Sequence, residues 1–272
     1  MREAVTVSAQ NPRDGDRDGA VVVVTGSTSG IGLALAAAAI GRGMRVVLNG
    51  RAPERVAAAE QRLAAPDGTM IGVAADLRDA DQAHQLAQAA VERFGRVDLW
   101  VNNAAGLFFA RAEDITPNGW RTIVDTNLNA AFHACRAVFP IMRAQGAGSI
   151  LNISSVAADR PHPGAAHYAA SKAALNSLTQ TLAVEWARYG IQVNGVALGP
   201  VLTEASRFND AVLRTEAEQE QPTGRIATAE EAAAVILDLA AVRSPYFTGE
   251  TVRVDGGFRS VLRNPMPDER GS

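Results

Sequence analysis

VVVVTGSTSGIGLALAAAAI, residues 21–40, is the stretch that decides the fold. Four consecutive valines without polar alternation are typical of a parallel strand that is buried on both faces. The alanine- and leucine-rich run at the end of the stretch is typical of a helix. A glycine-rich segment joins the two, so we expect a strand, a tight turn and a helix. In an open parallel sheet such a turn lies at the carboxyl edge of the strands, where nucleotides bind.

The glycines of this turn suit a bound pyrophosphate. Gly26 permits the tight turn, Gly30 lets the backbone approach the anion, and Gly32 allows the helix to pack closely. The first N–H groups of the helix would face the anion. An ordinary flexible turn is the alternative, which the flanking strand and helix disfavour. We therefore expect a nucleotide cofactor to contact Gly26, Ser27, Thr28, Ser29, Gly30, Ile31 and Gly32.

Strand and helix patterns alternate along the rest of the chain. Strand-like runs occupy residues 45–49, 70–75, 97–101, 149–153, 191–197 and 251–254. Helical patterns occupy residues 53–65, 79–94, 119–144, 167–188 and 228–241. This alternation predicts an α/β fold, a doubly wound parallel sheet with helices on both faces. We expect one domain over residues 20–260, between a disordered tail over residues 1–19 and a second tail over residues 261–272.

Composition narrows the class of partner. A chain of 272 residues, 47 % of them hydrophobic, can bury one large core. The net charge of −3 gives no basic field for nucleic acid or acidic lipid, so we expect small molecules as partners. No apolar run approaches the ~20 residues of a membrane helix, and the start lacks a signal core. We expect a cytoplasmic protein without a metal site, in which the single cysteine, Cys135, is buried and unreactive.

Three polar side chains are placed to act on one carbonyl group. Tyr168 and Lys172 lie four residues apart in an expected helix, so they project from one face. Ser155 follows the expected strand 149–153, again at the carboxyl edge of the sheet. A phenol of pKa ~10 is a poor acid near neutral pH, and an ammonium such as Lys172 lowers that pKa. Ser155 can donate a hydrogen bond to the oxygen on which negative charge develops during hydride addition.

Taken together, five motifs resemble those of the short-chain dehydrogenase/reductase family. They are Thr25-Gly-x3-Gly30-Ile31-Gly32, Asn102-Asn103-Ala104-Ala105, Asn127, Ser155 and Tyr168-x3-Lys172, within a match over about residues 20–258. The resemblance implies an oxidoreductase with a seven-stranded Rossmann-fold sheet and one nicotinamide cofactor. It implies that Tyr168 is the general acid or base and that Lys172 also binds the nicotinamide ribose. Asn127 would hold a water that links Lys172 to solvent, and a helix-bending core asparagine is the alternative.

The end of the second expected strand bears on the choice between NAD and NADP. An acidic residue there would bind the free 2′-hydroxyl of the adenosine ribose. This chain has Gly50 where the family's NAD-preferring members usually carry aspartate, and Arg51 beside it can pair with a 2′-phosphate. NADP(H) is therefore favoured over NAD(H). A solvated loop arginine is the alternative for Arg51, since Ser29 gives no second basic contact.

The resemblance assigns further cofactor contacts. Asp76 and Leu77, after the third expected strand, match the position that contacts the adenine. Asp76 is also a candidate cap of the following helix. Asn102 and Ala104 are expected to contact the cofactor, although Ala105 replaces the family's usual glycine and restricts the backbone there.

Two irregular segments are expected to complete the site. The Val201 backbone and the Thr203 hydroxyl are candidates for holding the nicotinamide carboxamide, although Leu198-Gly199 replaces the family's usual Pro-Gly pair. Residues 203–223 carry five acids and two arginines, which favours a mobile cover over the site, with a solvated surface excursion as the alternative. Together with residues 157–166, this segment should shape the substrate pocket.

Four ring side chains near the motifs have open roles. His162 either borders the substrate or lies on a surface loop. His167 is assigned no role, because successive residues of a helix point about 100° apart. Phe108 and Phe109 either line an apolar pocket or pack in the core.

Three functions fit the sequence. The leading one is an NADP(H)-dependent oxidoreductase that transfers hydride between nicotinamide and a ketone or secondary alcohol. The second is an enoyl thioester reductase of the same family, which residues 103–109, 118–120 and 185–190 resemble. The third is a nucleotide-sensing protein without turnover, which is disfavoured because such members usually lose the tyrosine or the lysine. The resemblance also implies that the helices over residues 119–144 and 167–188 pair between subunits, in a homotetramer or a dimer.

Overall fold

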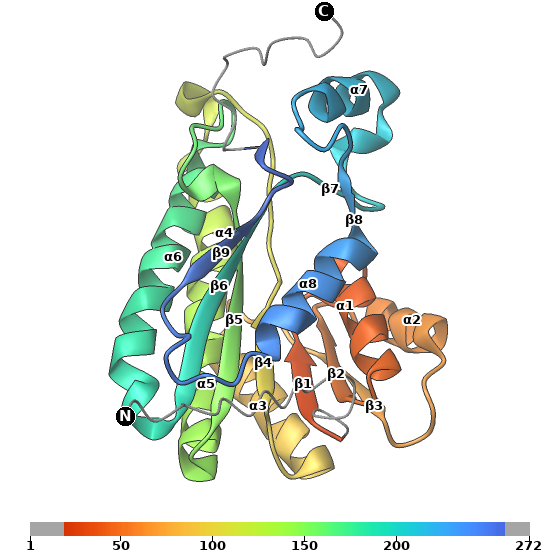
Figure 1. The fold of residues 1–272 in the computed structure, drawn as a ribbon, viewed down its shortest axis with the longest axis vertical. Helices are drawn as coiled ribbons and strands as arrows, with labels where there is room; N and C mark the ends of the chain where they lie inside the picture. Colours follow the sequence, from red (N-terminus) through yellow and green to blue (C-terminus); the bar gives the residue numbers. More distant parts are fainter. Residues whose placement is uncertain (1–18, 259–272) are drawn as a thin grey trace, which may run out of the picture.

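A seven-stranded parallel sheet forms the centre of the computed structural model, which describes residues 19–258 (Figure 1). The strand order is β3-β2-β1-β4-β5-β6-β9, and every neighbouring pair runs parallel. The strands are β1 (Val21–Val24), β2 (Arg45–Gly50), β3 (Met70–Ala74), β4 (Leu99–Asn102), β5 (Gly148–Ser155), β6 (Ile191–Leu198) and β9 (Thr251–Val254). Because all strands point one way, their carboxyl ends share one edge of the sheet.

Helices cover both faces of the sheet, which confirms the doubly wound fold expected from the sequence. They are α1 (Gly30–Gly41), α2 (Pro53–Leu63), α3 (Ala80–Phe94), α4 (Pro117–Val124), α5 (Ala130–Gln145), α6 (Ala166–Trp186), α7 (Ala211–Gln219) and α8 (Ala229–Ala240). Shorter turns are η1 (Ala112–Asp114), the π-helical η2 (Asp125–Asn129), η3 (Val156–Ala158), η4 (Ala187–Tyr189) and η5 (Arg207–Asn209). A separate two-stranded sheet joins β7 (Val201–Leu202) to β8 (Ala227–Thr228).

The four valines of β1 divide between two hydrophobic cores. Val21 and Val23 pack with residues of α3, α5 and α6 on one face, and Val22 and Val24 pack with residues of α1, α2 and α8 on the other. All four are completely buried. Burying one valine side chain stabilises a protein by about 1.5–3 kcal/mol relative to leaving it exposed. The absence of polar alternation in this strand therefore follows from its position at the middle of the sheet.

The helix expected over residues 119–144 is not one regular helix. It begins earlier, at Pro117, where the Thr116 hydroxyl caps it by accepting a hydrogen bond from the Gly119 N–H. The π-helical turn η2 then separates α4 from α5. The side chain of Asn127, inside this turn, bonds the backbone of Gly106 rather than its own helix. This long-range contact has no counterpart in the helical periodicity of the sequence.

The segment over residues 203–223 holds regular structure of its own. It contains the short turn η5 and the helix α7, whose amino end is capped by the Asp210 carboxylate. The carboxylate accepts hydrogen bonds from the N–H groups of Val212 and Leu213. Figure 1 shows α7 beyond the carboxyl edge of the sheet, connected to it through β7 and β8.

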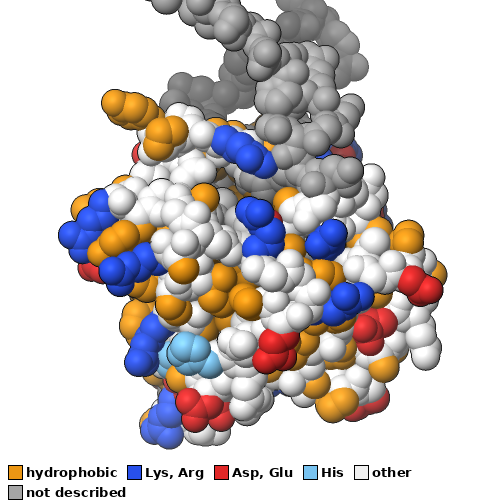
Figure 2. All heavy atoms as spheres, turned by 90° about the horizontal axis from the view of Figure 1, so that it is seen from below, with side chains coloured by type: hydrophobic (Ala, Val, Ile, Leu, Met, Phe, Trp, Pro, Cys, Tyr) orange, Lys and Arg blue, Asp and Glu red, His pale blue; other side chains and the backbone are white. Residues whose placement is uncertain are grey.

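The expected tails lie outside the described residues except for Gly19, whose N–H donates a hydrogen bond to the Gly43 carbonyl. Within residues 19–258, none of the helices combines the length and the apolar character needed to cross a membrane. The same residues contain no group of three or more His, Cys, Asp or Glu side chains that could hold a metal ion. Basic and acidic side chains are interspersed among apolar ones on the face seen in Figure 2.

The cysteine is buried, as expected. Cys135 has no exposed surface in α5, and burial raises the pKa of its thiol to about 12. Because the thiolate is the reactive form of cysteine, this side chain is unreactive near neutral pH.

Candidate active site

The glycine-rich turn lies at the carboxyl edge of the sheet, between β1 and α1. Gly26 has a positive φ of 63°, and a Cβ atom there would approach the Ala104 Cα to 2.8 Å. A Cβ atom on Gly32 would approach both the Gly26 carbonyl oxygen and the Asn103 side chain to 2.5 Å. Real side chains do not approach so closely, so both positions require glycine. The tight turn and the close packing expected from the sequence are therefore observed.

The amino end of α1 fits a bound anion. Its N-cap residue, Ser29, makes no side-chain hydrogen bond to the helix, and the first turn carries no acidic residue. The first N–H groups of the helix therefore have no capping partner and can donate to a phosphate. Gly30 has a positive φ of 55°, and a Cβ atom there would lie 3.4 Å from the Thr203 methyl group. This cradle of backbone groups fits the pyrophosphate of a dinucleotide.

Gly50 ends β2 beside the same turn. A Cβ atom on Gly50 would come within 2.5 Å of the Thr28 methyl group, so the threonine occupies the space that a larger residue would need. Arg51 follows and is exposed. Thr28 therefore excludes a larger residue at position 50, and Arg51, which is expected to favour NADP(H), follows that position.

Asp76 does not cap α3. The cap is Asp79, whose carboxylate accepts a hydrogen bond of 2.9 Å from the Asp81 N–H. Asp76 instead accepts hydrogen bonds of 3.0 Å from the Arg78 side chain. These bonds hold the pKa of Asp76 below its ordinary value, and the charge of Arg51 contributes to the same shift. Leu77 has a buried side chain, so its backbone is the part that can reach a ligand.

The two adjacent asparagines after β4 have different roles. The Asn102 side chain is buried, donates to the Asn152 side chain at 2.8 Å and accepts from the Trp100 indole at 2.9 Å. Only its backbone is free to meet a cofactor. Asn103 instead donates to the carbonyls of Thr25 and Gly26, at 2.9 and 3.1 Å.

Asn103 and Thr25 belong to the quoted motifs, but sequence reasoning assigned neither of them a role in the site. The Thr25 hydroxyl accepts hydrogen bonds of 3.0 Å from the N–H groups of Asn103 and Ala104, which fixes the turn against the end of β4. Successive side chains of a strand point to opposite faces. That rule separates the two asparagines but does not say which of them faces the turn.

Ser155, Tyr168 and Lys172 come together as the sequence predicts. Ser155 ends β5, while Tyr168 and Lys172 lie one turn apart near the start of α6. The side chain of Ser155 is close enough to Tyr168 to affect the pKa of the phenol, and the Ser155 hydroxyl accepts a hydrogen bond of 3.2 Å from the Ala157 N–H. The Lys172 ammonium lies 5.7 Å from the centre of the Tyr168 ring and donates a hydrogen bond of 2.7 Å to the Ile153 carbonyl.

The net shift of the Tyr168 pKa is opposite to the lowering expected from Lys172. Burial raises this pKa above its ordinary value, and the Ser155 side chain opposes the rise. The Lys172 ammonium donates to the Ile153 carbonyl, and its expected effect on the phenol stays a prediction. Burial lowers the pKa of Lys172 itself to about 8. Tyr168 is therefore protonated near neutral pH and available as a proton donor.

Asn127 is buried and holds three elements together. Its carboxamide oxygen accepts from the Gly106 N–H at 2.7 Å, and its NH2 group donates to the Gly106 carbonyl and the Ser171 hydroxyl. Ser171 in turn donates to the Tyr168 carbonyl at 2.7 Å. These bonds connect the loop after β4 to the helix that carries Tyr168. They support the structural alternative for Asn127, and its expected role in holding a water stays a prediction.

A large cavity, of about 830 Å³, joins the trio of Ser155, Tyr168 and Lys172 to the expected pocket segments. Among the predicted site residues, those that line it are Ile31, Ser155, Tyr168, Lys172, Val201 and Thr203. Gly26, Arg51, Asp76, Leu77, Asn102, Ala104 and Asn127 lie outside its lining. The segments over residues 157–166 and 203–223 both contribute to its wall, so the expectation that they shape the pocket is supported.

The ring side chains divide between the cavity and the interior. His162 and Phe109 line the cavity, with ring centres 5.9 Å apart. His167 is completely buried and meets the Phe108 ring edge-on at 4.2 Å. It does not line the cavity, in keeping with the absence of an assigned role.

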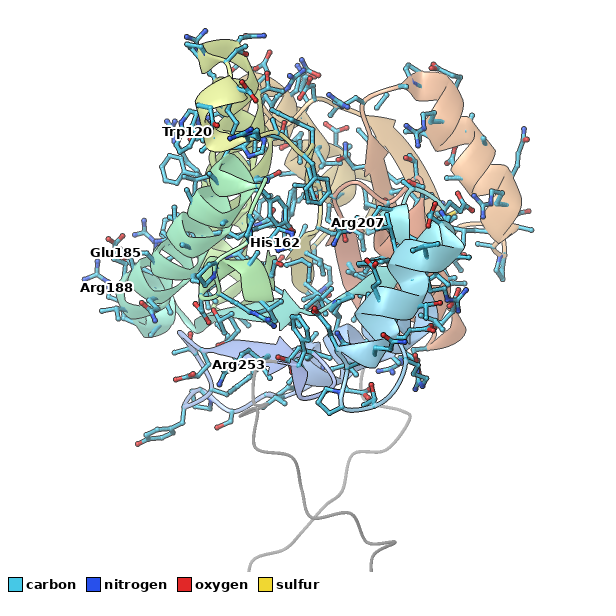
Figure 3. All side chains as sticks on the ribbon, turned by 90° about the horizontal axis from the view of Figure 1, so that it is seen from above. Trp120, His162, Glu185, Arg188, Arg207 and Arg253 are labelled. Carbon is cyan, nitrogen blue, oxygen red and sulfur yellow. The ribbon has the colours of Figure 1, made fainter. Side chains whose placement is uncertain are left out.

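Two arginines on the cavity wall, Arg160 and Arg207, were also missed. Both come from irregular segments whose path cannot be read from periodicity. Figure 3 labels Arg207 and His162 close to one another near the centre of the view, between α6 and α7.

Known proteins resemble this chain over nearly its whole length. The family model described as enoyl-(acyl carrier protein) reductase matches residues 26–259. A 3beta-hydroxysteroid dehydrogenase of Eggerthella lenta is 38 % identical over 89 % of this chain and 95 % of its own length. A Bacillus subtilis protein named "Probable 2,4-dienoyl-CoA reductase" is 34 % identical over 90 % of this chain and 98 % of its own.

Solved structures also resemble this chain in fold and in sequence. A structure described as an NAD(P)-dependent dehydrogenase of Beutenbergia cavernae, with NADP bound at low occupancy, has a TM-score of 0.83. It is 35 % identical, and the match covers 90 % of this chain and 98 % of that one. With the fold, the glycine turn and the Ser-Tyr-Lys trio, these matches show that the chain belongs to the short-chain dehydrogenase/reductase family of oxidoreductases.

Proposed function

We propose that this oxidoreductase is an NADP(H)-dependent carbonyl reductase, which interconverts a ketone and a secondary alcohol with Tyr168 as the acid and base. The observation that carries the proposal is that Ser155 and Tyr168 line the same cavity, with Ser155 close enough to affect the pKa of the phenol. Two hydroxyl groups at one point can both donate to a single carbonyl oxygen. This arrangement suits a reaction in which that oxygen becomes negative and is then protonated.

Each member of the trio has a distinct task in this proposal. Ser155 holds the carbonyl oxygen and stabilises its developing charge. Tyr168, kept protonated by burial, donates its proton to that oxygen in the direction of reduction. Lys172, which is buried, then returns a proton to Tyr168. Its lowered pKa favours proton exchange near neutral pH.

The cofactor would be held by residues along the carboxyl edge of the sheet. The turn from Gly26 to Gly32 would bind the pyrophosphate, and Val201 and Thr203 would meet the nicotinamide end. A bound nicotinamide supplies the hydride. NADP(H) is favoured because Gly50 offers no carboxylate and Arg51 beside it can pair with a 2′-phosphate. The dehydrogenase of Beutenbergia cavernae, with its bound NADP, supports the same choice.

Reduction of an enoyl thioester is the second candidate. The family model's description and the Bacillus subtilis relative both favour it. In that reaction the hydride goes to a carbon–carbon double bond, and the thioester oxygen needs a hydrogen-bond donor but does not keep a proton in the product, whereas the oxygen of a reduced ketone does. The intact pair of Ser155 and Tyr168 therefore favours the carbonyl reaction.

A parallel assay separates these functions. Purified protein is mixed with NADPH and either ketones or enoyl thioesters, and NADPH oxidation is followed, with NADH as the comparison cofactor. Turnover of ketones with a preference for NADPH is expected. Turnover of thioesters alone would establish the second candidate. Cofactor binding without turnover of either class would indicate a nucleotide-sensing protein.

A further inference from the structure

We infer that the cavity has a binding site for a substrate carboxylate, formed by Arg160 and Arg207 with His162, so that the substrate is a keto acid or hydroxy acid. The inference rests on the proposed carbonyl reduction and names its substrate class. The carbonyl end would lie at Ser155 and Tyr168, and the carboxylate at the arginines. All five residues line the same cavity.

The two arginines reach this cavity from separate loops. Arg160 follows η3 after β5, and Arg207 begins η5 after β7. Both are exposed, so they lie at the open part of the cavity, whereas Lys172 is buried. A substrate that spans the cavity would therefore place one end at the catalytic trio and the other between the arginines.

Aromatic rings position both guanidinium groups. Arg207 lies over the rings of Phe109 and Phe208, at 4.8 and 5.2 Å from their centres, and Arg160 lies over the ring of Phe258 at 4.1 Å. A cation–π contact uses the flat face of a guanidinium, and its N–H donors stay free at the edge. Those edges are the part that binds a carboxylate with two parallel hydrogen bonds.

No carboxylate neutralises these arginines within the described residues. Neither Arg160 nor Arg207 has an ion pair there, whereas nearby Arg214 and Arg225 pair with Glu218 and Glu231. The positive charges of Arg160 and Arg207 both act on His162. The pKa of His162 is lowered by burial first, and then by the positive charges of Arg207 and Arg160. A neutral His162 can donate one further hydrogen bond to the same anion.

Two acidic side chains, Glu216 and Glu220, also line the cavity, from α7 and the residue after it. Within the described residues, neither forms a salt bridge with Arg160 or Arg207. An anionic group is attracted to the arginines and repelled by these carboxylates, so the charges orient the substrate as well as bind it.

A matched pair of substrates tests the inference. The reduction of a keto acid is compared with that of its methyl ester, which keeps the ketone and removes the charge. The proteins are the native enzyme, Arg160→Gln, Arg207→Gln, the double variant and Arg93→Gln. Arg93 is the matched control, because it is exposed and also lies over an aromatic ring, Phe94 at 5.3 Å, but is not part of the cavity lining.

For the keto acid, kcat/KM should fall about tenfold or more with each cavity variant, as expected for lost hydrogen bonds to a charged group. The ester should change less than about threefold, and Arg93→Gln should change neither substrate. The KM for the acid should also rise with salt, because exposed charges are screened. Glutarate should inhibit the native enzyme competitively and the double variant weakly. Equal losses for acid and ester would overturn the inference.

Three further outcomes distinguish failure of this inference from failure of the proposed function. If the native enzyme reduces neutral ketones with the same kcat/KM as keto acids, the proposed carbonyl reduction stands, but the inferred carboxylate site does not. If the arginine variants weaken only coenzyme A thioesters, and not the matching short pantetheine thioesters, the anion is a nucleotide phosphate. That result would contradict the carboxylate assignment. If no ketone of either charge is reduced, the proposed function itself fails.

Discussion

At the scale of single residues, Lys172 is the most unusual charge of the protein. It is the only lysine of the chain, so every other fixed side-chain cation is an arginine. It is buried, and it donates a hydrogen bond to the Ile153 carbonyl. An arginine keeps its proton at any ordinary pH, whereas a buried lysine can release it. The choice of lysine at this one position suits a group that exchanges protons with Tyr168.

The titration of Lys172 can be measured directly. In protein labelled with ¹³C-lysine, one side-chain resonance should titrate with a pKa of about 8 instead of the ordinary 10.5. Between these two values the unfolded chain binds more protons than the folded protein, so the free energy of unfolding should rise with pH. Lys172→Met should lack this rise. A resonance that titrates above pH 10 would contradict the buried position.

The proposed preference for NADP(H) can be tested at Gly50 and Thr28. A Cβ atom on Gly50 would meet the Thr28 methyl group at 2.5 Å, so Gly50→Asp alone should weaken binding of both cofactors. The double variant Gly50→Asp with Thr28→Gly has room for the carboxylate, which can accept a hydrogen bond from a free 2′-hydroxyl. The ratio of kcat/KM for NADPH and NADH should shift toward NADH only in the double variant. A full shift in Gly50→Asp alone would show that Thr28 does not restrict this position.

At the scale of elements, the unit of β1, turn and α1 was predictable because its signals are local. Buried valines, glycines and an alanine-rich run each depend on residues a few positions apart. The π-helical turn η2 was not predictable, since it depends on hydrogen bonds between Asn127 and Gly106, 21 residues away. Asp79 rather than Asp76 caps α3, and here the reason is local, because Asp76 accepts hydrogen bonds from Arg78 two residues away.

The glycine turn gives a test with a matched control in the same helix. In Gly32→Ala the new Cβ atom would lie 2.5 Å from the Gly26 carbonyl oxygen, so the turn must distort. We expect a loss of about 1–3 kcal/mol in the free energy of unfolding and a large loss of NADPH affinity. Gly41→Ala in α1 has nothing within 4 Å of its Cβ and should be neutral or stabilising. Denaturant unfolding and NADPH fluorescence titration measure both effects, and normal cofactor binding by Gly32→Ala would argue against the proposed cradle.

At the scale of the whole molecule, the sequence predicted the parallel sheet and the helices on both its faces, but not the walls of the cavity. Alternating strands and helices determine the sheet, and the resemblance located Ser155, Tyr168 and Lys172 at its edge. Arg160 and Arg207 could not be placed, because the loops that carry them have no periodicity and meet only in the folded chain. The residues that select a substrate are thus the ones that local patterns describe least.

We propose that the chain forms a homotetramer or a dimer through α5 and α6, as its sequence suggested. Phe132 on α5 and Val184 on α6 expose 43 % and 83 % of their surface, so both helices offer an apolar side chain to a partner. Light scattering at micromolar concentration should give a mass of two or four chains, and Val184→Glu should lower it. A native monomer at that concentration would contradict the proposal. The expected cytoplasmic location also stays a proposal.

The central claim is that Tyr168 donates the proton to a carbonyl oxygen. The most direct measurement is single-turnover NADPH oxidation by Tyr168→Phe with a ketone that the native enzyme reduces, together with an NADPH titration of the variant. We predict a loss of about 10²–10⁴-fold in the rate of hydride transfer, with NADPH affinity within about threefold of native. A variant that binds NADPH and reduces the ketone at the native rate would contradict this account.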